Sequence, residues 1–354
     1  MNTKHVTMTM EDLRSPQMQE ACEILQQGGL VAFPTETVYG LGGDALNPDS
    51  SRKIYGAKGR PSDNPLIVHI ADMESLPQVA AHISEKAMTL ARTFWPGPMT
   101  LIFDKQPEVP LETTGGLETV AVRMPSHPIA QELIRQSGVY VAAPSANASG
   151  RPSPTRASHV AEDLDGRIDM IIDGDSLKDT SIGLESTIVD MTVEPPMILR
   201  PGYITREMLE EAVGTVEVDP AIENRTRTGN RVAKAPGMKY RHYAPKGQMT
   251  IVEGPQEKVV DTINDLVREK KALGCKVAVI ATSETAGLYQ CELVRCAGSR
   301  QVKGSIAAGL YDILREMDHL GAEFIFAESF QDDALGTAIM NRMIKAAGYH
   351  LIQV

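Results

Sequence analysis

The sequence predicts two successive α/β domains joined by a polar linker. In residues 1–212, apolar runs of strand length alternate with helical patterns and with loops rich in Gly, Pro, Ser and Asn. In residues 213–247 the hydrophobic periodicity fails, and the chain there is charged and holds several prolines, as interdomain linkers do. In residues 248–354 strand and helix patterns alternate regularly, and a length of 354 residues suits two domains.

The first domain begins with a helix and a buried strand. Met18, Ala21 and Leu25 fall on one helical face, Gly28 and Gly29 end the helix, and the strand follows. Strand-like apolar runs occupy residues 30–33, 66–70, 99–103, 139–143, 170–172 and 197–199, and a helix is predicted over residues 84–94. Because the residues with functional chemistry follow these runs, we expect the site in loops and at strand ends.

The second domain repeats a strand and a helix. Strands are predicted at residues 249–252, 276–280, 292–295 and 323–327, with helices around residues 259–271, after the third strand and at the end of the chain. The middle helix has one apolar stripe, formed by Ile306, Leu310, Ile313, Leu314 and Met317. Such a stripe packs on a sheet, so the alternation predicts a small parallel, Rossmann-like domain.

Composition narrows the classes of function. The chain is 42% hydrophobic and 23% charged, and its formal net charge of -11 argues against holding nucleic acid through the overall field of the protein. The four cysteines match no common zinc spacing and no disulfide framework, so we expect reduced, mostly buried thiols. No stretch approaches the roughly 20 apolar residues of a membrane span, which predicts a cytoplasmic protein with no membrane partner.

Two cations lie close together in the segment KGRPSDNP at residues 58–65. Lys58 and Arg60 are two residues apart, and on a strand-like backbone they would point the same way and converge on one anion. Polyphosphate suits this pair, because Arg offers a planar fork and Lys a point charge. A solvated basic loop is the alternative.

Small polar residues fill a second loop, VAAPSANASGRPSPT at residues 141–155. Ser145, Asn147 and Ser153 follow an apolar strand, and Gly150 lets the backbone approach a phosphate or ribose closely. An ordinary turn has the same composition.

The segment FPTETVYGLGGDA at residues 33–45 has two interpretations. Its GLGGDA part fits the pattern G-x-G-x-x-A, but Pro48 interrupts the helix that a dinucleotide site requires, so dinucleotide binding is not expected. Thr35, Thr37 and Tyr39 can instead hold a small polar ligand, unless they only form an alternating strand edge.

Three further polar residues end apolar strands. Arg123 and Arg200 lie where a cation is costly unless an anion meets it, and a ligand carboxylate would meet that need. His69 is either a ligand contact or a satisfied core histidine. Because no nucleophile elbow, H-E-x-x-H motif or Walker A loop is present, the residues by themselves indicate an α/β protein that binds an anion.

As a group, the motifs resemble those of a known family. The order and spacing of the long threonylcarbamoyl-AMP synthase family recur in PTETVYGLG, KGRPSDNPL, WPGPMT, AVRMPSHP, APSANASG, GLESTIVD, ILRPG and APGMKYRHYAP. The resemblance covers nearly the whole chain and implies a YrdC-like twisted open α/β domain, a linker and a Rossmann-like C-terminal domain. It also implies that L-threonine, bicarbonate and ATP become threonylcarbamoyl-AMP and pyrophosphate, for the threonylcarbamoyladenosine modification of tRNA.

The resemblance assigns residues to two ligands. For ATP it implies Lys58, Arg60, Asn64, Thr119, Ser145, Asn147, Ser153 and Arg200, with Lys58 and Arg60 catalytic. For L-threonine it implies Thr37, His69, Arg123, the backbone near Ala143, and Ser186. Mg²⁺ is expected with ATP, without a metal site made of protein side chains. A tRNA threonylcarbamoyl transferase complex is the expected downstream partner, and a weak contact with tRNA itself is allowed.

The implied intermediate, N-carboxythreonine, loses carbon dioxide readily in water, so we expect the site to close during the reaction. The linker motif APGMKYRHYAP is the predicted lid, and Tyr243 is its expected contact with the nucleotide. The alternative is a tether with no part in the reaction.

Two other functions stay open on the sequence alone. One is an RNA-binding module without catalysis, because YrdC-like domains resemble proteins with a concave basic surface, although the acidic composition opposes it. The other is a carbamoyl transferase that uses carbamoyl phosphate, since related domains occur in hydrogenase-maturation proteins. The acylphosphatase and zinc-binding regions of those proteins are missing from this sequence.

Overall fold

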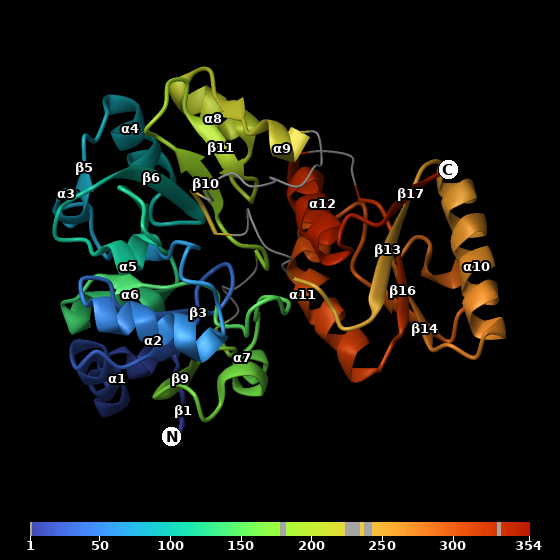
Figure 1. Cartoon of the computed structure of the whole chain (residues 1–354), viewed down its shortest axis with the longest axis horizontal. Helices are drawn as coiled ribbons and strands as arrows, with labels where there is room; N and C mark the ends of the chain where they lie inside the picture. The colour runs from blue at the N-terminus through green and yellow to red at the C-terminus, as the bar shows by residue number, and fades with distance from the viewer. Residues whose placement is uncertain (1, 178–181, 224–233, 237–242, 331–333) are drawn as a thin grey trace. The chain divides into compact units, whose positions relative to one another are not determined.

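The structure is a computed structural model that describes residues 2–177, 182–223, 234–236, 243–330 and 334–354 (Figure 1). The chain forms two compact units. The first contains Met1–Ser149 and Ser153–Lys239, and the second contains Gly150–Pro152 and Tyr240–Val354. Parts of the predicted linker, residues 213–247, therefore fall in both units.

One mixed sheet organises the first unit. Its strands are β1 (Lys4–Thr7), β2 (Val31–Phe33), β3 (Gly40–Asp44), β4 (Ile67–His69), β5 (Ala80–Ala81), β6 (Met99–Lys105), β7 (Thr119–Arg123), β8 (Val141–Ala142), β9 (Met170–Asp173), β10 (Thr187–Asp190), β11 (Met197–Arg200) and β12 (Glu217–Val218). They are ordered β1-β9-β2-β3-β8-β4-β7-β6-β10-β11-β12, with β5 paired to β6. Each apolar run predicted as a strand in this unit overlaps one of these strands, so those predictions are confirmed.

Helices pack on both faces of this sheet. On one face, α1 (Pro16–Gln26) and α6 (Pro128–Ser137) share a buried cluster with strand residues such as Phe33 and Ile172. On the other face lies a larger core that includes residues of α2 (Pro48–Lys58), α3 (Leu76–Val79), α4 (Glu85–Phe94), α7 (Ala157–Leu164) and α8 (Arg206–Val213). The short helices α5 (Leu111–Thr114), α9 (Pro220–Glu223) and the 3-10 turn η1 (Met10–Arg14) complete the unit.

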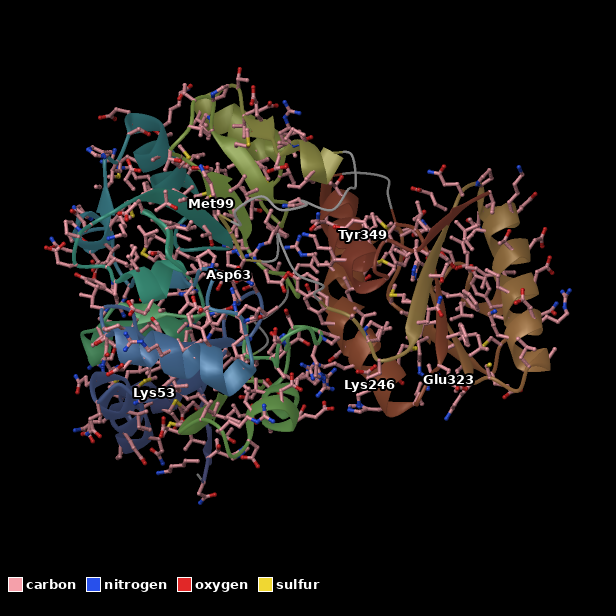
Figure 2. The ribbon with its side chains drawn as sticks, viewed as in Figure 1. Lys53, Asp63, Met99, Lys246, Glu323 and Tyr349 are labelled. Atoms are coloured by element: carbon pink, nitrogen blue, oxygen red, sulfur yellow. The ribbon has the colours of Figure 1, made fainter. Side chains whose placement is uncertain are left out.

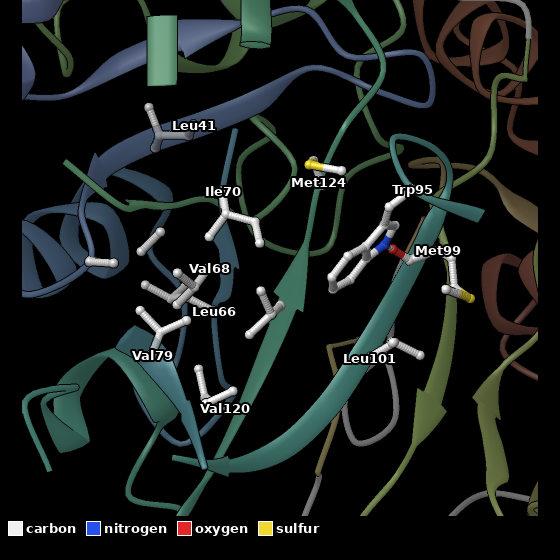
Figure 3. Packing of buried hydrophobic residues seen from close by; sticks show 14 of the residues in the cluster. Leu41, Leu66, Val68, Ile70, Val79, Trp95, Met99, Leu101, Val120 and Met124 are labelled. Carbon is white, nitrogen blue, oxygen red and sulfur yellow. Dashed lines mark hydrogen bonds between the residues drawn. The ribbon is translucent and has the colours of Figure 1, made fainter. Parts of the chain in front are cut away.

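The larger core contains the single tryptophan of the chain. Trp95 is buried among apolar residues such as Leu101 and Met124, and its indole nitrogen donates a hydrogen bond of 2.7 Å to the carbonyl of Met99 (Figure 3). The polar end of the indole is thereby satisfied, so the ring can stay buried at the start of β6.

The second unit has a five-stranded sheet in which every pairing is parallel. Its strands are β13 (Gln248–Glu253), β14 (Val277–Ala281), β15 (Leu293–Cys296), β16 (Phe324–Glu328) and β17 (Leu351–Gln353), in the order β15-β14-β16-β13-β17. Helix α10 (Gln256–Ala272) lies on one side, and α11 (Lys303–His319) and α12 (Ala334–Ala346) lie on the other, with the short turn η2 (Ala286–Leu288) (Figure 1). The apolar stripe of α11 is buried, so the predicted Rossmann-like domain is confirmed.

The four cysteines are free, but the prediction that most of them are buried is wrong. Cys22 is buried, and the apolar surroundings raise the pKa of its thiol to about 11. Cys296 is exposed, because it ends β15 at the edge of the second sheet, and Cys275 and Cys291 are half-buried. Within the described ranges, no helix is both long and apolar enough to cross a bilayer.

Candidate active site

Lys58 is the last residue of helix α2. The prediction of a strand-like backbone around Lys58 is therefore wrong. Pro48 begins α2 instead of interrupting a helix, and Gly59, with a φ of 61°, ends α2 directly after Lys58. The left-handed conformation that Gly favours thus turns the chain between the two cations. Lys58 and Arg60 are therefore not aligned by strand alternation.

The two cations have different partners. The ammonium group of Lys58 donates to the carbonyl of Asn147 at 2.5 Å and also to the carbonyl of Ser145. Arg60 donates through Nη2 to the carbonyls of Asn64 and Pro65, at 3.0 and 2.9 Å, and so organises its own loop. Figure 2 labels Asp63 in that loop. Lys58 binds the SAN loop, whereas Arg60 binds the segment that leads into β4.

The three polar segments singled out in the sequence meet in the first unit. Gly40 and Ser145 form an isolated β-bridge, and the amide of Ala146 donates to the carbonyl of Tyr39 at 2.8 Å. The amide of Ser149 donates to the carbonyl of Lys58 at 2.8 Å. The GLGGD segment is β3, antiparallel to β2 and β8, so it is no dinucleotide-binding turn.

The SAN side chains are ordered by one another. The Ser145 hydroxyl donates to Oδ1 of Asn147 at 2.5 Å, and Nδ2 of Asn147 donates to the carbonyl of Ala148 at 2.9 Å. The Ser153 hydroxyl donates to a carboxylate oxygen of Glu185 at 2.6 Å, and both side chains are buried. Glu185 was not among the predicted residues, although it lies in the GLEST motif next to Ser186.

A row of polar residues crosses five strands on one face of the sheet. His69 of β4 is the register partner of Arg123 of β7, and Arg123 is the register partner of Thr100 of β6. Thr100 is aligned with Ile188 of β10, which is paired with Arg200 of β11. Register partners point to the same face. We call His69, Arg123, Thr100 and Arg200 the polar row.

Serine and threonine hydroxyls link the members of this row. Arg200 donates to the carbonyl of Ser186 at 3.0 Å through Nε and to its hydroxyl at 3.1 Å through Nη2. The Ser186 and Thr100 hydroxyls are 2.8 Å apart. The sequence assigned Ser186 and Arg200 to different ligands, yet they share a hydrogen-bond network. Thr100 was missed, although it ends the WPGPMT motif.

His69 is a neutral, buried imidazole. Burial, and next the nearby positive charge of Arg123, lower its pKa to about 3. Its Nδ1 lies 3.0 Å from the carbonyl of Ile67, so Nδ1 carries the proton in this contact. The Phe33 ring lies edge-on at 6.3 Å. The backbone of Val141, the register partner of His69 on β8, forms a further hydrogen bond with the imidazole, so the fold itself uses much of its hydrogen-bonding capacity.

Arg123 pairs with a carboxylate that the sequence analysis missed. Glu36 lies between Thr35 and Thr37, and its Oε1 is 2.6 Å from Nη2 of Arg123. The two side chains are only 6% and 5% exposed. Glu36 stands in the PTETVYG motif, in which the sequence analysis considered only Thr35, Thr37 and Tyr39.

The remaining predicted residues lie as follows. Thr37 is buried with its hydroxyl 2.9 Å from that of Thr35, and the Ala143 amide donates to the carbonyl of Ile67 in β4 at 2.8 Å. Asn64 is buried, and its Oδ1 has no hydrogen-bond partner among the described residues. Thr119 begins β7 whereas Arg123 ends it, about 13 Å away at the usual rise per strand residue. Thr119 is thus not brought to the polar row.

Part of the predicted lid lies beside the polar row. Ala235 is buried in a small apolar cluster with strand residues that include Ile67, Ala121 and Ile188, and Nη1 of Arg200 is 3.5 Å from the carbonyl of Pro236. These residues flank the row on the same face of the sheet. Residues 237–242 of the motif lie outside the described residues.

Tyr243 belongs to the second unit, where its ring lies 5.3 Å from that of Tyr311 in α11. Its predicted contact with the nucleotide stays a prediction.

No set of three or more His, Cys, Asp or Glu side chains in the described part of the chain is arranged to hold a metal ion.

Together the fold and the site define a small-molecule-binding α/β protein, with buried cations and hydroxyls at strand ends and a Rossmann-like second unit. Residues 23–202 match the Sua5_yciO_yrdC family, described as telomere recombination, and residues 204–348 match the C-terminal domain of threonylcarbamoyl-AMP synthase. The chain belongs to the threonylcarbamoyl-AMP synthase family, in its long form. The family, and with it the class of activity predicted from the sequence, is thereby confirmed.

Several relatives are similar over nearly the whole chain. The threonylcarbamoyl-AMP synthase of Bacillus subtilis (strain 168) is 50% identical over 339 residues, which cover 96% of this chain and 95% of the relative. The threonylcarbamoyl-AMP synthase of Pyrococcus abyssi is 49% identical over 334 residues, covering 94% and 95%. A crystal structure of P. abyssi Sua5 complexed with L-threonine covers all of both chains with a TM-score of 0.92 and 46% identity.

Proposed function

We propose that this chain condenses L-threonine, bicarbonate and ATP into threonylcarbamoyl-AMP and pyrophosphate in its first unit, for the modification of tRNA. The observation that carries the proposal is the polar row, where two buried arginines and a neutral histidine each end a strand of the same sheet. Buried cations at such positions need anionic partners, and a carboxylate and a polyphosphate supply them.

The threonine subsite is centred on Arg123. Its guanidinium binds the substrate carboxylate, and His69 and Thr37, which are buried nearby, bind the other polar groups. Ser186 and the backbone near Ala143 complete this subsite. A relative with 46% identity is known as a complex with L-threonine, which supports the proposal.

The nucleotide subsite is formed by the KGRP and SAN loops. Lys58 and Arg60 act on the phosphates, with Asn64, Ser145, Asn147, Ser153 and Arg200 around them. The contact between Lys58 and the carbonyls of Ser145 and Asn147 supports this grouping, because it joins the two loops. Thr119, at the far end of β7, has no such support.

The reaction needs no covalent enzyme intermediate. Bicarbonate adds to the amine of L-threonine to give N-carboxythreonine with loss of water and a proton, and its new carboxylate attacks the α-phosphorus of ATP. Pyrophosphate leaves. Lys58, Arg60 and Arg200 stabilise the negative charge that develops on the phosphates, so positioning and electrostatics supply most of the acceleration. We propose that Mg²⁺ arrives bound to ATP, whose phosphate oxygens are the ligands that this ion prefers.

The linker motif APGMKYRHYAP is proposed as a lid that protects N-carboxythreonine from water. Burial of Ala235 beside the polar row supports this role, because it brings the described part of the motif to the threonine subsite. Threonylcarbamoyl-AMP is an activated acyl donor, so we also propose a tRNA threonylcarbamoyl transferase complex as the downstream partner, in the cytoplasm.

The test is pyrophosphate release by the purified full chain, with and without L-threonine and bicarbonate, and with L-serine as the control amino acid. Release that requires both L-threonine and bicarbonate supports the proposal. Release that requires carbamoyl phosphate instead would favour a carbamoyl transferase. Retention of tRNA with no release under any combination would favour an RNA-binding module.

A further inference from the structure

We propose that Glu36 is the receptor for the α-ammonium group of L-threonine. The inference rests on the proposed function and adds to it a substrate contact that the sequence motifs do not assign. It starts from the ion pair between Glu36 and Arg123, in which each charged group uses only part of its hydrogen-bonding capacity.

The pair is buried and half satisfied. Oε1 of Glu36 lies 2.6 Å from Nη2 of Arg123. Oε2 of Glu36 and Nε of Arg123 are also buried, and neither has a hydrogen-bond partner among the described residues. Polar atoms of this kind are costly to leave unpaired, so their presence in neighbouring residues of opposite charge indicates a ligand that pairs with both.

An α-amino acid has the complementary arrangement. Its carboxylate and its ammonium group are attached to one carbon atom, and together they carry no net charge. The carboxylate can accept from Nε of Arg123 while the ammonium group donates to Oε2 of Glu36, so the existing contact between the two residues is kept. His69, the register partner of Arg123, is neutral and does not compete for either charge.

Local structure holds Glu36 in place for this role. Thr35 donates from its hydroxyl to the carbonyl of Val38 at 2.6 Å, which closes the turn that contains Glu36. The carbonyl of Glu36 accepts from the amide of Ile182 at 3.4 Å. The carboxylate is therefore carried by a backbone that is fixed on both sides, as a binding group requires.

The proposal predicts a specific coupling between Glu36 and the amine of the substrate. (R)-3-Hydroxybutyrate is L-threonine without its α-ammonium group, so it keeps the contact with Arg123 and lacks the contact with Glu36. Dissociation constants of both ligands are measured by calorimetry for the full-length wild-type chain and for Glu36→Gln. Glu112→Gln is the control, because it also removes one carboxylate from an ion pair. Glu112 lies on α5 and pairs with Arg52 of α2, and neither residue belongs to a proposed subsite.

We expect Glu36→Gln to weaken binding of L-threonine by about tenfold or more, the range for a hydrogen bond to a charged group, and to leave binding of (R)-3-hydroxybutyrate nearly unchanged. Equal losses for the two ligands would overturn the proposal, because Glu36 would then only orient Arg123 or support the fold. Unchanged binding of L-threonine would overturn it as well.

Two further measurements separate the possible causes of failure. Threonine-dependent pyrophosphate release by the wild-type chain tests the proposed function independently of Glu36. If Glu36→Gln does not fold, Glu36→Asp keeps the charge and shifts the carboxylate. Glu36→Asp should then weaken the binding of L-threonine more than the binding of (R)-3-hydroxybutyrate. Equal losses of affinity for both ligands would again reject the proposal.

Discussion

His69 and Arg123 are register partners on the parallel strands β4 and β7, and each is the last residue of its strand. The arrangement places a neutral imidazole beside a buried guanidinium. Because burial and this cation both oppose protonation, the imidazole adds no second positive charge beside Arg123.

This relationship predicts how stability depends on pH. In the folded chain the pKa of His69 is lowered to about 3, whereas in the unfolded chain the imidazole binds a proton below its ordinary pKa of about 6.5. The stability that depends on the neutral form is therefore complete above pH of about 6.5 and is lost as the pH falls toward 3, at about 1.4 kcal/mol per pH unit.

The measurement is urea unfolding of the wild type and of His69→Asn between about pH 7 and pH 5. The wild type should lose stability more steeply than the variant in this window. Equal pH dependence in the two proteins would show that folding does not lower the pKa of His69.

Lys58→Ala should lower the rate of threonine-dependent pyrophosphate release by about tenfold or more, since a cation in the phosphate subsite is lost. The matched control is Lys53→Ala on the same helix α2 (Figure 2). Lys53 donates to the carbonyl of Gly28, away from both proposed subsites, so its loss should leave the rate unchanged. A fully active Lys58→Ala enzyme would remove Lys58 from the mechanism.

Two glycines of the same segment should respond oppositely to alanine. Gly59 has a φ of 61°, so Gly59→Ala should destabilise the chain by about 1–2 kcal/mol. Gly56 is inside α2 and an added Cβ would meet no atom within 4 Å, so Gly56→Ala should stabilise by about 0.5–1 kcal/mol. Chemical unfolding of both variants measures whether each substitution raises or lowers the free energy of unfolding. The same sign for both would contradict the backbone geometry described for Gly59.

The proposed lid can be tested by introducing a charge at Ala235, the first residue of the APGMKYRHYAP motif. Ala235 is fully buried in an apolar cluster, so Ala235→Glu should displace the segment, because an unpaired carboxylate is costly there. We expect ATP consumption to continue while formation of threonylcarbamoyl-AMP falls, as also expected for deletion of residues 236–245. Ala221→Glu, at a half-buried position of α9, is the control. Unchanged coupling in Ala235→Glu would indicate a passive tether.

The sequence predicted the buried strands and the loop motifs but not how they meet. Apolar runs such as residues 66–70 identify β4 because both of its faces are buried. In contrast, β3 has the sequence GLGGD, which contains no such run. The turn at Gly59 was missed because KGRPSDNP is polar throughout, which also suits a loop. Glu36 and Thr100 gave no periodic signal, and their roles depend on pairings between strands that are distant in the chain.

The polar row also bears on how the chain folds. Its members come from β4, β6, β7 and β11, and β6 and β11 are joined only through β10, which lies between them in the sheet. The pairings of β4 with β7 and of β6 with β10 close long loops, and such contacts form late because their entropy cost precedes their stabilisation. Affinity for L-threonine should thus appear late during refolding, after most helical structure has returned, so that ligand binding reports on completion of the native topology.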